Sequence, residues 1–552
     1  MSRDGNANEN QHEQASSPHP ENRLNRRRFI TAASATGALA LAGCMGGGDG
    51  GDGGDGGSGG DGGSGGDGGS SGEPQSGGTL NWGGSVPVQT LDPHLESAAA
   101  SARVLENITE GLLTVDWEYN LQPDLAKSWE TSEDNTKLTF ELREGVKFHN
   151  GEEMTSADVL ASLERVANGE QYLANGYFEN VDSMKAPDDY TFEITLTEPF
   201  APFLARMATS EMHVVPEAQA QQDQIKEPIG TGPFQFDSME IESEFVMTKF
   251  EDYWGEPAML DKVVKKEVSD ASVRLQSFQA GELDFINDVP PKDVQSVESQ
   301  SNTRFETTFP KALVYMGLNC NREPFDDKHA RLALDFAIDK AEVAEAALYG
   351  TGKPAATPAA PGSPWENTDL EPRPKDLEKA KEHLAQSAYP DGYTATFKIP
   401  EPYAAQVTAA KIIQDSASEV GINLEIQKIP WSLWLSDVYS KQDFQATTSS
   451  YLALWYPDVS YYKFLHPNGA YFFTGWENDE YNTLVEDARR IYDTDERAEK
   501  YHRAAEILQE DRAGHLFLFW QANLFAADSS YQGKIGAPDG STLRFEDNWL
   551  DQ

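Results

Sequence analysis

The architecture of this 552-residue chain is first visible in residues 137–151, which read KLTFELREGVKFHNG. From Lys137 to Leu142, apolar and polar residues alternate, a pattern typical of a strand with one buried face. Asn150-Gly151 then supplies a turn, and Thr155-Ser156-Ala157-Asp158 forms a capping box that begins a helix. We therefore expect a strand over 137–142 and a helix over about 156–167, as in an α/β fold.

The same succession of helical and strand patterns continues to the end of the chain. Apolar residues at helical spacing predict further helices, and short alternating or continuous apolar runs predict further strands. The expected helices are Arg331–Leu348, Ala404–Val420 and Arg497–Gln509, and the expected strands are Ile422–Ile426 and Leu516–Trp520. We expect the proline-rich segment Lys353–Pro374 to be an extended surface segment, because proline does not fit regular structure.

The composition is strongly acidic. The chain has 91 Asp and Glu residues against 44 Lys and Arg, which gives a formal net charge of −47. This balance excludes the basic footprint of a nucleic-acid-binding protein. Apolar residues still make up 38% of the chain, enough for the cores of two or three domains. Because multi-molar salt shortens the screening length to about 3 Å or less, we expect a globular protein of a halophile.

The amino terminus has the pattern of an export signal. The pair Arg26 and Arg27 precedes a small, apolar run that ends at Gly43 and is shorter than the roughly 20 residues of a spanning helix. Leu41-Ala42-Gly43-Cys44 resembles the lipobox of lipoproteins, in which cleavage precedes the Cys and its thiol takes a lipid. We interpret residues 1–43 as a twin-arginine lipoprotein signal peptide and Cys44 as the lipidated terminus.

Residues 44–78 are nearly all Gly, Asp and Ser, so they cannot bury enough apolar surface to offset the entropy of ordering. As a Gly-rich coil, this tether has a reach of roughly 30 to 35 Å. We expect the folded body to lie at the outer face of the cell membrane, lipid-anchored and exported by the twin-arginine route.

Motifs for catalysis and metal binding are absent from the sequence. HExxH, GxSxG and CxxC do not occur, and the histidines lack metal-ligand spacing. Gly350-Thr351-Gly352-Lys353 lacks the first glycine of a P-loop and has Pro354 at the magnesium-binding position. We therefore expect no catalytic residue, no metal and no cofactor. A tethered extracellular enzyme, with a site outside the known motifs, is the alternative of another class.

A series of short motifs resembles the peptide/nickel family of ABC-transporter solute-binding proteins, also called family 5. The resemblance covers roughly residues 79–552, and the motifs occur in the order of the family. They are Leu91-Asp92-Pro93, Ala126–Glu130, Leu142–Gly151, Ala157-Asp158-Val159, Gly230–Phe234, Asp252–Gly255, Gly281–Asp284, Pro324–Asp327 and Ala337–Lys340.

This resemblance implies a two-lobed α/β fold of the periplasmic-binding-protein type (type II, cluster C). Lobe 1 is expected over 79–311, with an inserted subdomain at about 113–198, and over 521–552 after the chain returns; lobe 2 is expected over 312–520. It also implies a monomer that binds a solute between the lobes and delivers it to an ABC permease and its ATPase.

The resemblance further indicates where a solute would be held. In peptide-binding members, a Trp on a strand-to-helix turn is followed by an Asp that anchors the α-ammonium of the peptide. The Trp corresponds to Trp431, whereas the Asp position falls on Leu454 or Trp455, depending on register. Neither is a carboxylate, and a buried ammonium without a counter-charge is costly. Asp458 is the candidate replacement.

Aromatic residues gather in the same region. They are Trp431, Trp434, Tyr451, Trp455, Tyr456, Tyr461, Tyr462 and Trp476. Such rings either fill the core or stack on sugar rings and other partly apolar solutes. The expected ligand contacts are Trp431, Tyr451, Leu454, Trp455, Tyr456 and Asp458. A di- or oligopeptide is the favoured solute, an oligosaccharide is the alternative, and a nickel or other metal chelate has no supporting His cluster.

Overall fold

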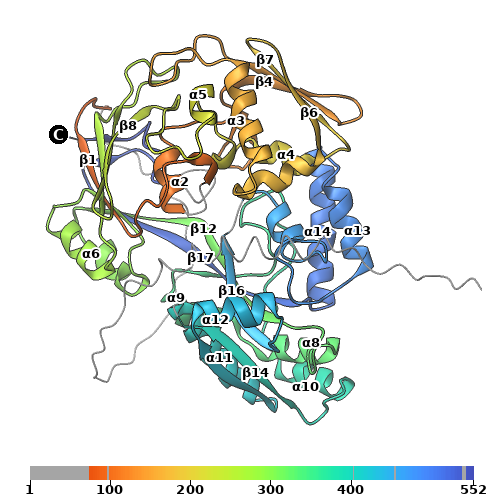
Figure 1. Ribbon diagram of the computed structural model, residues 1–552. Helices are drawn as coiled ribbons and strands as arrows, with labels where there is room; N and C mark the ends of the chain where they lie inside the picture. The colour runs from red at the N-terminus through yellow and green to blue at the C-terminus, as the bar shows by residue number, and fades with distance from the viewer. Residues whose placement is uncertain (1–73, 96–98, 402, 453–454, 537–542, 552) are drawn as a thin grey trace, which may run out of the picture.

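The computed structural model describes residues 74–95, 99–401, 403–452, 455–536 and 543–551. The expected signal peptide with Arg26, Arg27 and Cys44, most of the tether, and Leu454 lie outside these ranges. Within them, no helix is long and apolar enough to cross a membrane. Figure 1 shows two bodies, lobe 1 above and lobe 2 below, with strands β12 (Thr303–Leu318) and β17 (His515–Asp528) between them.

A mixed sheet of 11 strands runs through both lobes. Its order is β15 (Ile422–Ile429), β14 (Tyr393–Pro400), β16 (Ala446–Leu452), β12, β17, β11 (Phe285–Asn287), β1 (Thr79–Gly84), β10 (Lys262–Glu267), β9 (Glu244–Lys249) and β8 (Phe234–Glu240), with β13 (Lys353–Pro354) also beside β17. Strand β1 is parallel to β10 and β11, and β14 is parallel to β15 and β16. Each lobe therefore contributes its own group of parallel strands to the sheet.

Strands β12 and β17 form one antiparallel ladder across the boundary of the lobes. In lobe 1, Thr303 to Thr308 pair with Asp528 to Asn523; in lobe 2, Ala312 to Gly317 pair with Gln521 to His515. The register shifts between Thr308 and Ala312, where Pro310 has no N–H to donate to a ladder. The expected boundary at 311/312 lies beside this bulge, whereas Gln521, expected in lobe 1, pairs with Ala312 in the lobe 2 part of the ladder.

Lobe 1 contains a second, separate sheet. Its order is β4 (Ala126–Thr131), β5 (Lys137–Leu142), β7 (Thr191–Leu196) and β6 (Val181–Asp188), and helix α3 (Ser156–Asn168) contacts it. Leu138, Phe140 and Leu142 are fully buried, as their alternation predicts. The capping box at Thr155 and Asp158 is formed. This sheet lies inside the range expected for the inserted subdomain.

The remaining elements of lobe 1 are short. They are η1 (Pro93–Leu95), α2 (Ala99–Leu105), β2 (Leu113–Val115), β3 (Leu121–Pro123), η2 (Leu173–Asn180), α4 (Ala201–Arg206), η3 (Ser210–Met212), α5 (Glu217–Ala220), α6 (Ala271–Gln279), η4 (Pro291–Asp293), α7 (Val294–Glu298), β18 (Tyr531–Gln532) and β19 (Trp549–Leu550).

Lobe 2 has two apolar cores, one on either side of its part of the sheet. The first core includes side chains of α8 (Lys328–Ala337), α9 (Lys340–Leu348), α10 (Leu377–Gln386) and α11 (Ala404–Ser418). The second includes side chains of α12 (Trp431–Trp434), η5 (Leu435–Ser440), η6 (Asp458–Lys463), α13 (Asp479–Ala488) and α14 (Thr494–Glu510).

Two sequence-based expectations were wrong in lobe 2. The helix expected over 331–348 is two helices, because Ile338 is extended and the Asp339 carboxylate caps α9 by accepting two backbone N–H bonds. The segment 353–374 lacks helices, as expected, but it is not simply a surface segment. Its first residues pair with β17, and Ala355 and Trp365 are buried in the second core.

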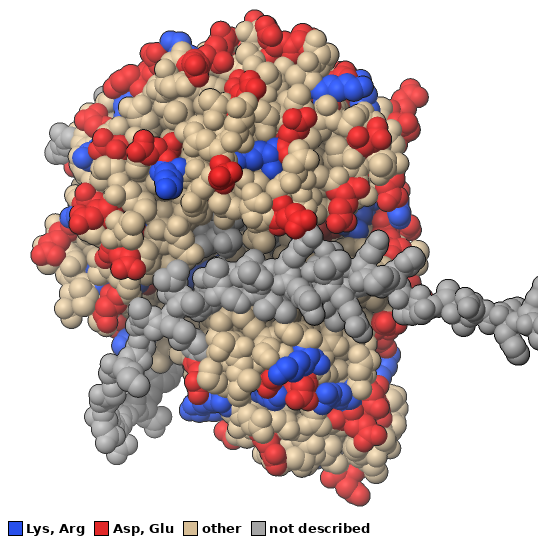
Figure 2. Space-filling view, viewed as in Figure 1, with Lys and Arg blue, Asp and Glu red and all other residues tan. Residues whose placement is uncertain are grey.

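The acidic excess of the composition lies on the outside of the molecule. Figure 2 shows Asp and Glu side chains spread over both lobes, with fewer Lys and Arg between them. Carboxylates without basic neighbours repel one another unless salt screens them. The folded body therefore carries its negative charge where added salt can act on it.

A buried ionic cluster holds the helices of lobe 2 to the end of α14. Asp335 is fully buried and forms ion pairs with Lys340 at 2.8 Å, Arg373 at 2.9 Å and Arg512 at 3.0 Å. Burial alone would raise the pKa of Asp335, but the three neighbouring cations outweigh it and hold the pKa well below its usual range. The carboxylate therefore stabilises lobe 2 at neutral pH and loses this effect only as the pH falls below about 4.

We expect Asp335→Asn to lower the free energy of unfolding by about 3 to 5 kcal/mol, because it leaves buried cations without a counter-charge. Urea unfolding at neutral pH and at pH 3 measures this. The difference between wild type and variant should shrink at the lower pH. Glu378→Gln, which removes an exposed carboxylate paired with Lys381, is the control and should change stability by less than about 0.5 kcal/mol. Equal effects of the two variants would contradict the assignment.

Candidate binding site between the lobes

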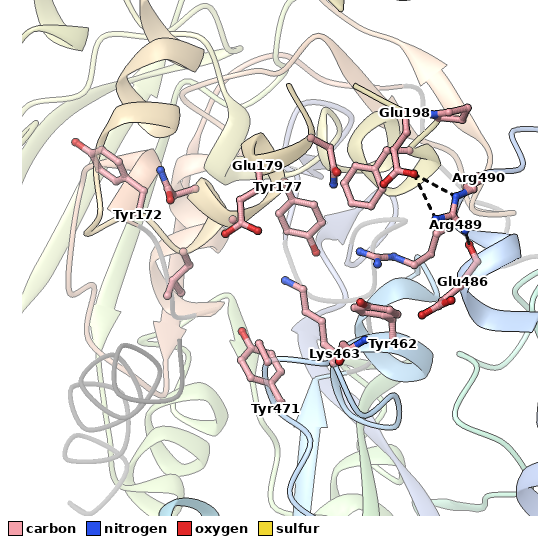
Figure 3. A pocket seen from close by; sticks show the side chains of 18 of the residues that line it. Tyr172, Tyr177, Glu179, Glu198, Tyr462, Lys463, Tyr471, Glu486, Arg489 and Arg490 are labelled. Carbon is pink, nitrogen blue, oxygen red and sulfur yellow. Dashed lines mark hydrogen bonds and ion pairs between the residues drawn. The ribbon is translucent and has the colours of Figure 1, made fainter. Parts of the chain in front are cut away.

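A cavity of about 810 Å³ lies between the two lobes. Lobe 1 contributes the segment around η2 and the residues ahead of α4; lobe 2 contributes the end of η6, the loop after it and the end of α13. Figure 3 shows side chains from both lobes pointing into the same space. The lining residues that carry rings or charges are Glu170, Tyr172, Tyr177, Glu179, Glu198, Phe200, Tyr462, Lys463, Tyr471, Glu486, Arg489 and Arg490.

Tyrosine rings line the cavity from both sides. Tyr177 comes from η2 of lobe 1, whereas Tyr462 and Tyr471 come from lobe 2. Phe464 lies at 5.0 Å from Tyr471 and at 4.4 Å from Tyr451 behind it, measured between ring centroids. Aromatic side chains thus form a continuous layer from the cavity wall into the core of lobe 2. Such a wall offers flat apolar faces together with hydroxyl groups.

Arg489, near the end of α13, connects the cavity to the boundary of the lobes. Its Nε donates to Asp458 at 2.7 Å, and its guanidinium lies 3.5 Å from the ring centroid of Tyr462. It also lies 4.9 Å from the ring centroid of Phe200, which belongs to lobe 1. The carbonyl of Arg489 accepts a hydrogen bond from the N–H of Ala201 at 2.8 Å. One arginine therefore makes ionic, aromatic and backbone contacts, two of them across the boundary.

Asp458 is fully buried and does not line the cavity. Its Oδ1 accepts the bond from Arg489, while its Oδ2 has no hydrogen-bond partner among the described residues. The candidate replacement for the lost ammonium anchor is therefore already paired with a protein cation.

Trp455 and Tyr456 are enclosed by lobe 1. Both rings belong to a buried apolar cluster with Val115, Tyr119 and Ala205, which we call the interlobe cluster. The carbonyl of Trp455 accepts a bond from Nε1 of Trp365 at 2.9 Å, which fixes the segment to lobe 2. The sequence pattern placed these rings in a site; the structure has them in the contact between the lobes, beside the cavity rather than on its wall.

Arg206 of lobe 1 makes a polar contact with a residue of the interlobe cluster. An Nη of Arg206 donates to the hydroxyl oxygen of Tyr456, and the other Nη donates to Glu211 at 2.8 Å. The guanidinium also lies 4.7 Å from the ring centroid of Tyr177. Because a hydrogen bond to a charged group contributes about 1.5 to 3 kcal/mol, this contact favours the arrangement in which the lobes touch.

Trp431 and Tyr451 lie in lobe 2 away from the cavity wall. Trp431 stacks on Trp434 with centroids 4.8 Å apart, and Tyr403 meets it edge-on at 5.5 Å. Nε1 of Trp431 and the hydroxyl of Tyr451 are buried without a hydrogen-bond partner among the described residues. Leu454 lies outside the described residues.

Several cavity residues were missed by sequence reasoning. Tyr177 and Arg489 lie far from the motifs that pointed to a site, and only the fold brings them to it. Lys463 offered a signal, because it directly follows Tyr461 and Tyr462 in a chain where basic residues are scarce.

Comparison with known proteins agrees with this architecture. Residues 120–485 match the family described as "Bacterial extracellular solute-binding proteins, family 5 Middle". The chain belongs to this family of ABC-transporter substrate-binding proteins, which are binding proteins rather than enzymes.

Individual relatives bind different solutes on the same fold. The chain is 30% identical over 345 residues to the glutathione-binding protein GsiB of Escherichia coli K12, covering 61% of this chain and 67% of that protein. The structure of DppA from Helicobacter pylori in complex with the peptide STSA has a TM-score of 0.72 and 25% identity, covering 87% of this chain and 99% of that one. NikA from Brucella suis in complex with Fe(III)-EDTA shares the fold, with a TM-score of 0.78, 24% identity and coverage of 86% and 100%.

We expect Tyr456→Phe to increase the radius of gyration of the protein without solute, measured by small-angle X-ray scattering. The variant removes the hydroxyl that accepts from Arg206, which shifts the ratio of separated to touching lobes by about ten- to hundredfold. Tyr389→Phe, which removes a hydroxyl from lobe 2 away from this contact, should leave the radius unchanged. An unchanged radius in Tyr456→Phe would show that this hydrogen bond does not hold the lobes together.

Proposed function

We propose that this protein is the lipid-anchored receptor of an ABC importer, which captures a peptide or peptide-like solute between its lobes and delivers it to the permease. The observation that carries the proposal is the cavity of about 810 Å³ with walls from both lobes. A volume of about 300 to 1,000 Å³ is typical for small-molecule sites, so a short peptide fits better than a long chain. A solute that contacts both walls favours the closed arrangement over the open one.

Among the solutes that a receptor of this family could bind, we favour a peptide. The names of the relatives support it, since GsiB is a glutathione-binding protein and DppA binds the peptide STSA. The tyrosine-lined wall also suits a sugar ring, which keeps an oligosaccharide as the second candidate. No cluster of metal-ligating side chains exists within the described ranges, so a metal would have to arrive as a chelate.

The proposed location follows from residues 1–78. A twin-arginine signal and a lipidated Cys44 would anchor a monomer at the outer face of the membrane, within the reach of its tether. The acidic surface supports a halophilic setting, because high salt screens the repulsion among its carboxylates.

We expect Cys44→Ser to move the protein from the membrane fraction to the medium, because the thiol that takes the lipid is gone. Immunoblots of membrane and medium fractions measure this. Cys320→Ser changes the other cysteine of the chain and should leave the protein on the membrane. Replacing both Arg26 and Arg27 with Lys should retain it inside the cell. Membrane retention of Cys44→Ser would contradict the lipid anchor.

A thermal-shift screen of the purified full chain in multi-molar KCl identifies the solute class. Defined tripeptides and neutral oligosaccharides are the two arms of the screen. A ligand at 100 times its dissociation constant stabilises the native state by about 2.7 kcal/mol, which is readily measured. We expect a shift with peptides. A shift with saccharides alone would replace the peptide assignment with the second candidate.

A further inference from the structure

The ammonium of Lys463 has an unusual position at the cavity. Lys463 ends η6 in lobe 2, and Figure 3 shows its side chain pointing into the cavity between Tyr177 and Tyr471. Its Nζ lies 4.2 Å from the ring centroid of Tyr177 and 5.8 Å from that of Tyr471. A cation over aromatic faces is stabilised by the ring quadrupoles, but the rings do not neutralise its charge. Lys463 is thus oriented by both lobes without being neutralised.

The other cations of the cavity already have carboxylate partners. Arg489 is paired with Asp458 at 2.7 Å, and Arg490 is paired with Glu198 across the lobes at 3.3 Å. Within the described part of the chain, no carboxylate forms an ion pair with Lys463; the exposed Glu179, on the opposite wall, does not reach it. Lys463 is therefore the lining cation whose charge is left for a bound molecule.

The local environment makes an unneutralised ammonium costly. Burial lowers the pKa of Lys463, since desolvation disfavours the charged form; the carboxylates of Asp458 and Glu211, which form no ion pair with it, offset only part of this effect. A partly desolvated cation without a counter-charge is destabilising, and a carboxylate brought in by a ligand removes that cost. The chain has 91 acidic residues, so a half-buried lysine that forms no ion pair within the described residues is not explained by the composition.

We propose that Lys463 is the anchor for a carboxylate of the solute, so that the receptor selects acidic solutes over otherwise identical neutral ones. This inference rests on the proposed function, because it needs a solute in the cavity. In this proposal a lysine of the protein holds a carboxylate of the solute, whereas the family resemblance implies an Asp that holds the ammonium of a peptide. The carboxylate end of a peptide would meet lobe 2 beside Tyr177 of lobe 1, a contact available only when the lobes are together.

The test compares paired ligands on paired variants. The probes are the tripeptide with the largest thermal shift and the same tripeptide with its carboxyl terminus amidated. The proteins are the full-length wild type, Lys463→Met, which keeps the length of the side chain and removes its charge, and Lys463→Arg, which keeps the charge. Isothermal titration in multi-molar KCl gives the dissociation constants. Enclosed charge pairs are screened much less than exposed ones, so the preference should persist at this salt concentration.

We expect wild type to bind the free acid about ten- to hundredfold more tightly than the amide, as a charge-assisted hydrogen bond implies. Lys463→Met should lose this preference while keeping its affinity for the amide, and Lys463→Arg should keep it. Lys381→Met, which removes a positive charge from the exposed face of α10, is the matched control and should behave as wild type. Thermal unfolding without ligand reports whether each variant is folded.

Equal affinities of wild type for acid and amide would overturn the proposal, as would an unchanged preference in Lys463→Met. If no peptide binds, the peptide part of the proposed function fails, and the anchor is measured separately with trigalacturonate against its methyl ester. If wild type binds trigalacturonate more tightly than its methyl ester, and Lys463→Met binds the two equally, the anchor is supported with a different solute. Binding of neutral sugars alone, or of neither probe, would overturn it.

Discussion

The antiparallel pairing of β12 with β17 is the constraint on which the rest of the structure depends. The lobe 1 part of the ladder continues into β11 and β1, and the lobe 2 part continues into β16 and β14. The bulge between Thr308 and Ala312 separates the two parts, because the ladder cannot continue in register through Pro310. Each lobe has its own apolar cores on either side of this point, so the position of one lobe relative to the other depends on these two strands and on the contacts across the cavity.

Sequence reasoning was reliable where local pattern and burial coincide. The strand at 137–142 and its capped helix were found because alternation, turn and capping box agree over a short stretch. It failed at Ile338-Asp339, where a continuous apolar pattern hides a break that the Asp339 cap makes favourable. It also failed at 353–374, because the prolines of this segment neither prevent the short strand β13 nor indicate that Trp365 is buried. Burial of an irregular segment depends on what the rest of the chain places around it.

The candidate site, too, could be predicted from the sequence only in part. The aromatic residues from Tyr451 to Tyr462 were recognised as important, but the structure gives their rings different surroundings. Tyr451 and Tyr461 lie in the second core of lobe 2. Trp455 and Tyr456 enter the interlobe cluster, whereas Tyr462 and Lys463 reach the cavity wall. No sequence pattern separates these groups, because the lobe 1 residues that they contact lie more than two hundred positions away, such as Ala205 for Trp455 and Tyr177 for Lys463.

Lobe 2 is formed by one continuous segment that is inserted into the sequence of lobe 1. The polypeptide enters it through β12 and leaves it through β17, so both the first and the last described strands, β1 and β19, lie in lobe 1. Any pull exerted through a segment ahead of β1 therefore acts first on lobe 1, and it reaches lobe 2 through the two crossing strands and through the noncovalent contacts between the lobes. Lobe 2 thus has no chain terminus of its own among the described residues, and its covalent connection to the rest of the protein consists of these two strands.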